Sequence, residues 1–359
     1  MLNPESLLRI YSKKMPKAWK AADRIRQLKG RNGIPTWPGW CFVPSLGWYE
    51  IVSMGKSDFE YLQTSVPQKM RAGYEVDRIS ALGAWRPSKG IYRFEPEILD
   101  CLIRTPLSGD MPAEVFFRLP AWCVFIDVQG SGLTYNSSLI KGFFVLFDYN
   151  FDNKKSYLMF VFDLADSAEL AVLRLPMGQY SVTEALTELL VEYEEVKAHA
   201  LSQGVELRME SEFPSERVAD EVRSLLSLIV YICSDKPDLG VIGRGAKTKG
   251  LPKISKGATV TPEAPQVTYY SVGSKTARAI RKAEAGDISS SKLEIDGERA
   301  SSSRRPHFRQ AHWHHFWTGP REPREGEERK LIVRFLLPTL VKGIDKTSDS
   351  VYESLSDQT

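Results

Sequence analysis

Four short runs of β-branched and aromatic residues follow one another in the middle of the chain, and they limit the possible folds more than any other feature. They occupy residues 122–128, 141–149, 157–164 and 170–175, with Gly, Asn and Asp between them. Such residues favour extended strands, and short connections favour antiparallel neighbours. The sequence therefore predicts an antiparallel meander at the centre of the fold.

Helical patterns flank these strands on both sides. Residues 181–184 read Ser-Val-Thr-Glu, a capping box that predicts the start of a helix with one apolar face. A second helix is predicted at 214–233. Further elements are expected at residues 4–29 (helical, interrupted at Pro16), 58–82 (helical), 90–94 (strand), 96–103 and 112–119 (helical), with an ordered aromatic loop at 30–49. Together they indicate an α+β fold whose largely antiparallel central sheet is covered by helices.

Composition divides the chain into four parts. The first is a helical N-terminal part with an α+β body (1–238). The second is a flexible connection rich in Gly, Lys and Ser (239–303), which contains one strand (266–271) and one basic helix (274–285). A basic aromatic β-hairpin (304–343) and a disordered tail (344–359) follow.

Overall charge and cysteine content exclude several classes of protein. A net charge of +3 is too small for a dedicated nucleic-acid binder, so any basic surface must be local. The four cysteines are far apart and lack C-x-x-C spacing, which predicts reduced core thiols. No apolar run suits a secretory signal or a membrane span, so we expect a cytoplasmic protein with no membrane contact.

Four of the five histidines lie within residues 304–317. If this tract is a strand, His312, His314 and Phe316 share one face, because side chains alternate along a strand. Trp313, His315 and Trp317 then share the other. We expect its hairpin partner at residues 330–337, across a loop containing Gly and Pro.

Two chemical interpretations of this tract involve catalysis or a metal ion. His312 and His314 could present two imidazoles to a metal, although no cysteine is near in sequence to complete the site. Alternatively, two of His307, His312 and His314 could act as acid and base in a ribonuclease, with Arg305 or Arg309 stabilising phosphate charge.

Recognition is the interpretation that we favour, and structural packing in a sheet is its competitor. Arginine and aromatic side chains in alternation suit RNA, whose bases stack on rings, and they suit acidic peptide surfaces. The candidate binding residues are Arg305, Arg309, His312, Trp313, His314, Trp317 and Arg334.

Trp85, Arg86 and Tyr92 are candidates for peptide binding, since they combine aromatic and basic character. A tryptophan at a helix end is, however, often a packing anchor. The sequence contains no P-loop, dinucleotide fingerprint, G-x-S-x-G or H-E-x-x-H motif, and no convincing helix-turn-helix. These absences favour a binding protein over an enzyme and a DNA-binding regulator.

Several motifs resemble those of the type V-A anti-CRISPR proteins of the second class. They are Leu-Gly-Ala-Trp-Arg at 82–86, Leu-Pro-Ala-Trp-Cys-Val at 119–124, Arg-Pro-His at 305–307 and His-Trp-His at 312–314. The resemblance extends along nearly the whole chain.

The resemblance implies an inhibitor of effector production in a bacterial host. Such a protein recognises the nascent N-terminal polypeptide of the type V-A effector nuclease, and the translated mRNA is then lost. The implied partners are that polypeptide and its mRNA or the translating ribosome, with no cofactor, metal or small-molecule substrate. The alternative is an RNA-binding ribonuclease of a mobile genetic element that acts through the His/Arg tract.

Overall fold

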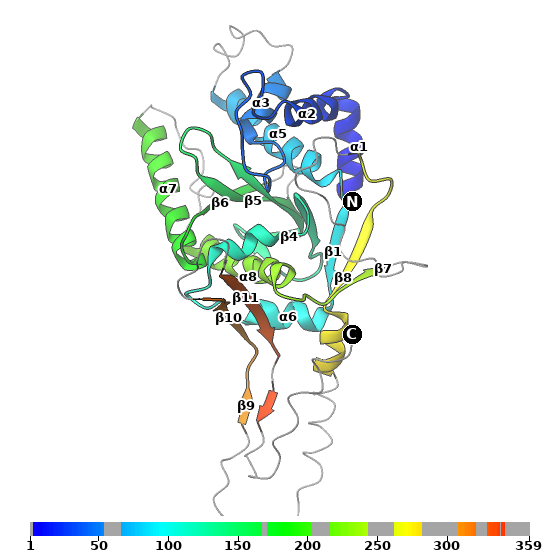
Figure 1. Cartoon of the computed structure of the whole chain (residues 1–359), viewed down its shortest axis with the longest axis vertical. Coiled ribbons are helices and arrows are strands. Elements are labelled where there is room, and N and C mark those ends of the chain that lie inside the picture. The colour runs from blue at the N-terminus through cyan, green and yellow to red at the C-terminus, as the bar shows by residue number, and fades with distance from the viewer. Residues whose placement is uncertain are drawn as a thin grey trace, which may run out of the picture.

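A mixed β-sheet forms the centre of the computed structural model, which describes residues 3–53, 66–166, 171–202, 216–242, 262–281, 307–320, 329–337 and 339–341 (Figure 1). The strand order is β6-β5-β4-β2-β1-β8-β7, and β3 pairs with β4. The strands are β1 (Gly90–Phe94), β2 (Cys123–Asp127), β3 (Thr134–Tyr135), β4 (Ser138–Tyr149), β5 (Ser156–Leu164), β6 (Ala171–Met177), β7 (Leu239–Ile242) and β8 (Thr268–Val272).

The predicted antiparallel meander is confirmed for all four runs, which form β2, β4, β5 and β6. Strand β1 differs, because it runs parallel to both β2 and β8. Parallel neighbours need a long crossover connection, and helices supply it between β1 and β2. The sheet is thus largely antiparallel, as expected, with a parallel centre that local sequence patterns do not reveal.

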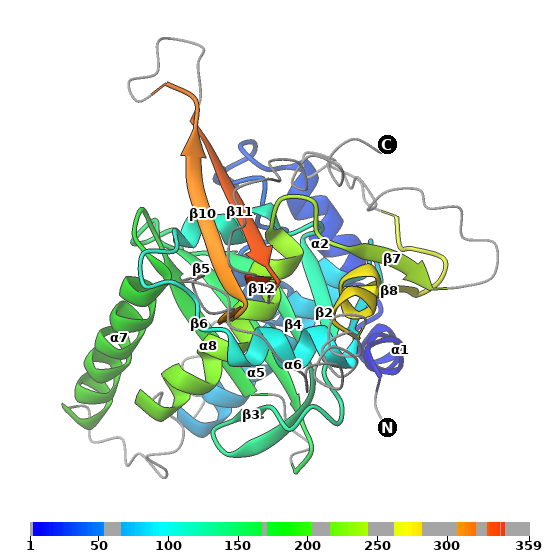
Figure 2. The same cartoon turned by 90° about the horizontal axis from the view of Figure 1, so that it is seen from below.

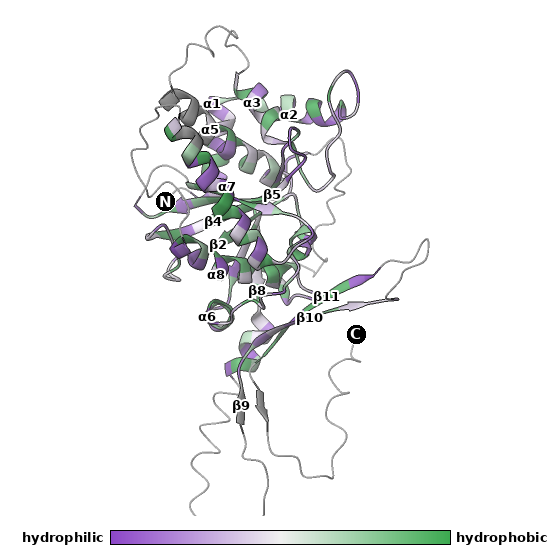
Figure 3. Ribbon diagram, turned by 90° about the vertical axis from the view of Figure 1, so that its left-hand side faces the viewer, coloured by the Kyte–Doolittle hydropathy of each residue, from purple (hydrophilic) through white to green (hydrophobic). Residues whose placement is uncertain are grey.

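Helices cover both faces of the sheet, so that successive strand residues are buried on opposite sides (Figure 3). Phe143 and Val145 belong to one apolar cluster, whereas Phe144 and Leu146 belong to the other. One face is covered by α1 (Pro4–Lys14), α2 (Ala18–Gln27), α3 (Ser45–Ser53) and α5 (Val66–Trp85). The other is covered by α6 (Pro96–Arg104), the 3₁₀ helix η1 (Ala113–Arg118), α7 (Val182–Ser202) and α8 (Glu216–Cys233).

The helix α3 begins inside the segment that the sequence predicts as an aromatic loop. The carboxylate of Asp148 accepts hydrogen bonds from the Ser45 backbone N–H at 2.9 Å and from the Ser45 hydroxyl at 2.5 Å. The capping residue lies on a strand 103 residues away, so the sequence near Ser45 does not predict where this helix begins.

The described parts of the segment predicted as a flexible connection contribute two strands to the sheet. The predicted strand at 266–271 is observed as β8, and β7 pairs with it antiparallel where we expected a loop. Residues 274–281 are helical, as predicted. Residues 243–261 and 282–303 of that connection and the tail at 344–359 lie outside the described residues.

The C-terminal tract forms the predicted hairpin, which extends beyond the body (Figure 2). Its strands are β10 (His312–Thr318) and β11 (Lys330–Leu336), and shorter strands, β9 (His307–Arg309) and β12 (Thr339–Val341), pair at its base. The four cysteines carry free thiols, as predicted. None of the described helices has the length and apolar content needed to cross a bilayer.

Candidate functional site

One face of the hairpin is docked on the body. Trp313 is 6% exposed, its ring lies 4.9 Å from that of Phe335, and its indole Nε1 donates to the Ser227 hydroxyl at 3.1 Å. On the same face, His315 Nδ1 lies 3.3 Å from the Ser108 hydroxyl. The face alternation predicted from the sequence therefore holds, and it is the tryptophan side that packs.

Arg118 and Asp235 fasten β11 to the body. The Asp235 carboxylate accepts from the Val333 backbone N–H at 2.8 Å, and the Asp235 N–H donates to the Val333 carbonyl at 2.9 Å. Arg118 pairs with the same carboxylate at 3.2 Å and also donates to the Leu331 carbonyl. Because both side chains are largely shielded from water, these contacts fix the hairpin's position against α8 and η1.

The opposite face of the hairpin is open. His314 and Arg334 are exposed and sit directly across from each other in the antiparallel register. The His314 ring lies 5.2 Å from that of Phe316, and His312 Nδ1 lies 3.1 Å from the Gln310 carbonyl. Among the described residues Arg334 has no ion-pair partner. Imidazole, guanidinium and aromatic groups together on one open face suit phosphate or carboxylate recognition combined with stacking.

Trp317 shares a face with Trp313 and His315 but is less covered by the body. It is 38% exposed, and the Arg329 guanidinium lies over its ring with 5.4 Å to the ring centre. The ring lines a pocket of about 710 Å³, and Asp110 and Glu184 line the same pocket. Trp317 is thus the one tryptophan of the described hairpin that a ligand could touch.

Burial corrects the expectation for Trp313 as an RNA-binding residue. Its ring is enclosed between the hairpin and α8, so a base could not stack on it without undocking the hairpin. Arg305 lies outside the described residues. His307 and Arg309 belong to β9, where only the backbone pairing is described.

Burial also corrects the expectation that Trp85, Arg86 and Tyr92 bind a peptide. The Trp85 indole donates to the Gly90 carbonyl at 2.8 Å inside the core, and Tyr92 stacks on Tyr270 with 4.7 Å between ring centres. Arg86 is buried and pairs with Asp23 at 3.1 Å. All three are packing residues in this structure, as the competing interpretation of Trp85 held. No group of three or more metal-binding side chains occurs in the described part of the chain.

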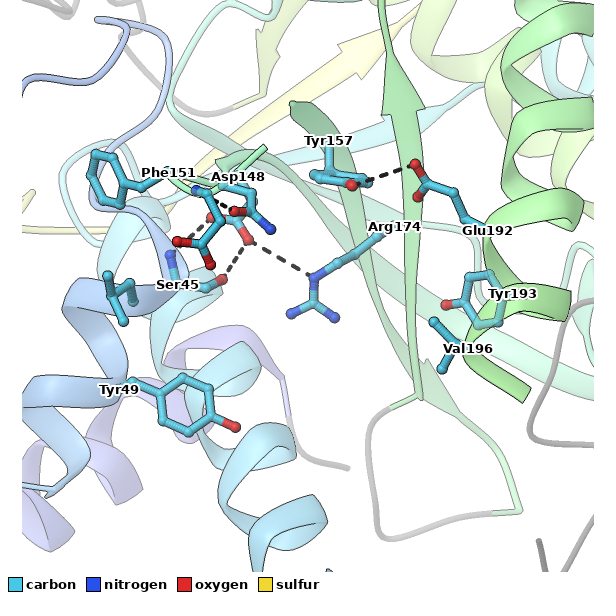
Figure 4. A pocket seen from close by; sticks show the side chains of 12 residues that line it. Ser45, Tyr49, Asp148, Phe151, Tyr157, Arg174, Glu192, Tyr193 and Val196 are labelled. Carbon is cyan, nitrogen blue, oxygen red and sulfur yellow. Dashed lines mark hydrogen bonds and ion pairs between the residues drawn. The ribbon is translucent and has the colours of Figure 1, made fainter. Parts of the chain in front are cut away.

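A pocket that the sequence did not suggest lies between α3, the β4–β5 turn, β6 and α7 (Figure 4). Arg174 points into it and pairs with the Asp77 carboxylate, while its Nε lies 3.9 Å from Asp148. Burial alone would lower the pKa of Arg174, but the two carboxylates outweigh it and raise the pKa, so the guanidinium stays charged. The pocket combines four segments far apart in sequence, and no local motif marks it.

Comparison with known proteins identifies a family for this chain and a solved structure with a similar fold. The AcrVA2-like anti-CRISPR type V subtype A2 family matches residues 92–343. The chain belongs to this family. The crystal structure of AcrVA2 has a similar fold, with a TM-score of 0.60 and 19% sequence identity over 93% of this chain and 97% of that chain. No match is found among the curated proteins.

The chain is therefore an anti-CRISPR protein of the type V-A family, as the sequence motifs suggested. The part matched by the anti-CRISPR family extends from β1 to the end of the hairpin, so it includes the open face of β10 and β11. It also includes Asp148, Arg174 and Val196 of the pocket, whereas the α3 wall of the pocket precedes it.

Proposed function

We propose that this anti-CRISPR protein suppresses production of the type V-A effector nuclease. In this account it recognises the effector's nascent N-terminal polypeptide in the cytoplasm of the bacterial host, and the translated mRNA is lost. Membership of the anti-CRISPR type V subtype A2 family is the observation that carries the proposal.

The open face of the hairpin is the part that we assign to RNA or the translating ribosome. It places His314 and Arg334 opposite each other, next to the ring of Phe316. Guanidinium groups hold phosphates and exposed rings stack on bases, which is how proteins commonly bind single-stranded RNA. The polypeptide would then bind elsewhere on the body.

The test uses cells that carry an inducible type V-A effector gene together with this protein. Wild-type protein should lower the effector's mRNA and protein levels, and a transcript whose start codon is removed should be spared because no nascent chain is made. Replacing His314 and Arg334 together by alanine should restore the mRNA while leaving polypeptide binding intact.

The matched control for the hairpin variant is Arg104→Ala, which removes an exposed arginine from α6. This control should behave as wild type. Equal loss of the translated and untranslated transcripts would contradict recognition through the nascent chain. An unchanged mRNA loss with the hairpin variant would remove the hairpin's assigned role.

A ribonuclease is the second candidate, because His312 and His314 share the open face with Arg334 opposite. Two imidazoles and a guanidinium are the groups that acid–base cleavage of RNA uses. Purified protein incubated with the effector transcript, with and without a chelator, distinguishes the two functions. If the transcript is cleaved and His314→Ala abolishes the cleavage, the protein is a ribonuclease. If the transcript stays intact, the protein binds RNA without cutting it.

A further inference from the structure

The pocket between α3 and α7 has a shape and lining suited to a side chain of a partner. Its volume is about 480 Å³, and the rings of Tyr49, Phe151, Tyr157 and Tyr193 line it (Figure 4). Concave sites with aromatic walls and a few polar groups are typical ligand sites. The pocket is separate from the hairpin face, to which we assigned RNA.

Two aliphatic side chains at the pocket are unusually exposed. Leu46 on α3 is 56% exposed and Val196 on α7 is 59% exposed. They stand on the two helices that flank the pocket, so an occupant with an apolar stem would cover both. Burying exposed apolar side chains favours association.

The charges around the pocket determine which polar group fits. Two carboxylates, Asp77 and Asp148, face the one guanidinium of Arg174. Lys155 is likewise shared between two carboxylates, with Nζ 2.6 Å from Glu192 and 3.0 Å from Glu188.

Asp152 adds a further negative charge to the lining, and among the described residues its carboxylate has no partner. Carboxylates therefore outnumber cations on the walls. A cation would be attracted to this site, and an anion would be repelled.

An occupant that combines a cationic head with an apolar stem is a lysine or arginine side chain. The faces of tyrosine and phenylalanine rings attract such cations, and their methylene stems pack on aliphatic groups. We propose that this pocket binds a basic side chain of the polypeptide that the protein recognises, with Asp152 and Glu192 facing the cationic head. This inference rests on the proposed function, because it takes the partner to be a polypeptide.

The test measures binding of fluorescent peptides that cover the N-terminal segment of a type V-A effector. Each lysine is replaced in turn by norleucine and each arginine by citrulline, which removes the charge. One such replacement should weaken binding to the wild-type protein about tenfold, as expected for a close charge pair. Asp152→Lys should weaken binding of the unmodified peptide by a similar factor. Combining this variant with the modified peptide should cause no further loss of affinity, because both changes remove the same charge pair.

Matched variants separate the pocket from general effects. Asp220→Lys makes the same charge change at an exposed site on α8 and should bind as wild type. Val196→Trp should obstruct the pocket and weaken binding, whereas Val191→Trp adds the same ring to α7 away from the lining and should not.

Two contrary results are distinguishable. If peptides bind, but equally to wild type, Asp152→Lys and Val196→Trp, the pocket assignment is overturned and the proposed function stands. If wild-type protein binds no N-terminal peptide and leaves effector production unchanged in cells, the proposed function fails and the pocket assignment fails with it.

Discussion

Aromatic rings packed against glycine make some single positions intolerant of even one added carbon. A Cβ atom on Gly83 of α5 would lie 2.3 Å from Cη2 and 2.6 Å from Cζ2 of Trp48. Trp48 is completely buried, so its ring has nowhere to move. Gly73 lies on the same helix, but a Cβ there would meet its nearest atom, the Tyr49 hydroxyl, at 3.5 Å.

Gly83→Ala should therefore destabilise the protein, although alanine is the better helix former. The helix propensity gain is about 1 kcal/mol, and overpacking a core costs about 1–3 kcal/mol. Gly73→Ala keeps the gain without the clash and should be neutral or stabilising. Chemical unfolding of both variants measures the difference, and equal stability of the two would refute the packing argument.

At the residue scale, the sequence predicts which side chains share a face but not which face is buried. Alternation places His312 and His314 apart from Trp313 correctly. The face that carries Trp313 is the packed one because Trp313 contacts Ser227 of α8, which is 86 residues away in the sequence. The sequence also does not show that Trp85 and Tyr92 are buried. Tyr92 packs on Tyr270, which is far away in the sequence and comes close only when the chain folds.

At the scale of elements, α7 shows how a local signal can be sufficient. The Glu184 carboxylate accepts from the Ser181 N–H at 2.7 Å, and the Glu184 N–H donates to the Ser181 hydroxyl at 3.2 Å, as the capping box predicts. Helix α3 is the opposite case, since its cap is supplied by Asp148 of a distant strand. Local patterns therefore predict α7 and miss α3.

Ser181→Ala should lower the free energy of unfolding by about 1 kcal/mol, the usual value of an N-cap. Thr187→Ala on the exposed side of α7 is the control and should change it by less than about 0.5 kcal/mol. Hydrogen exchange at the first turn of α7 should rise in the first variant alone. Equal effects of the two variants would mean that the cap does not hold the helix end.

The capping box should also respond to acid. The Ser181 backbone N–H and hydroxyl hold the pKa of Glu184 below its ordinary value. A lowered folded-state pKa stabilises the protein above the unfolded pKa, and this contribution is lost as pH falls through the folded value. The difference between wild type and Glu184→Gln should thus shrink on acidification. A difference that is constant with pH would contradict this.

At the scale of the whole molecule, a three-layer body carries a hairpin with one docked and one open face. The α+β class and the hairpin follow from sequence patterns. The parallel pairing of β1 with β8 does not, because it joins segments almost 180 residues apart through side-chain packing on both faces. The pocket is missed for the same reason.

Asp235→Ala should loosen the hairpin without unfolding the body. It removes the acceptor for the Val333 N–H and the partner of Arg118, and leaving such partly buried groups unpaired costs about 1 kcal/mol or more. Hydrogen exchange of β11 should rise while that of β4 stays slow. Asp220→Ala is the exposed control, and the same exchange in both variants would show that Asp235 does not anchor the hairpin.

The proposed function requires the protein to act on the effector while the effector is being translated. The most direct measurement is to recover tagged protein from cells translating a type V-A effector, sequence the RNA that comes with it and identify the bound peptides. If the proposed function is right, the effector's own transcript is enriched together with its N-terminal peptide. Recovery of neither would contradict it.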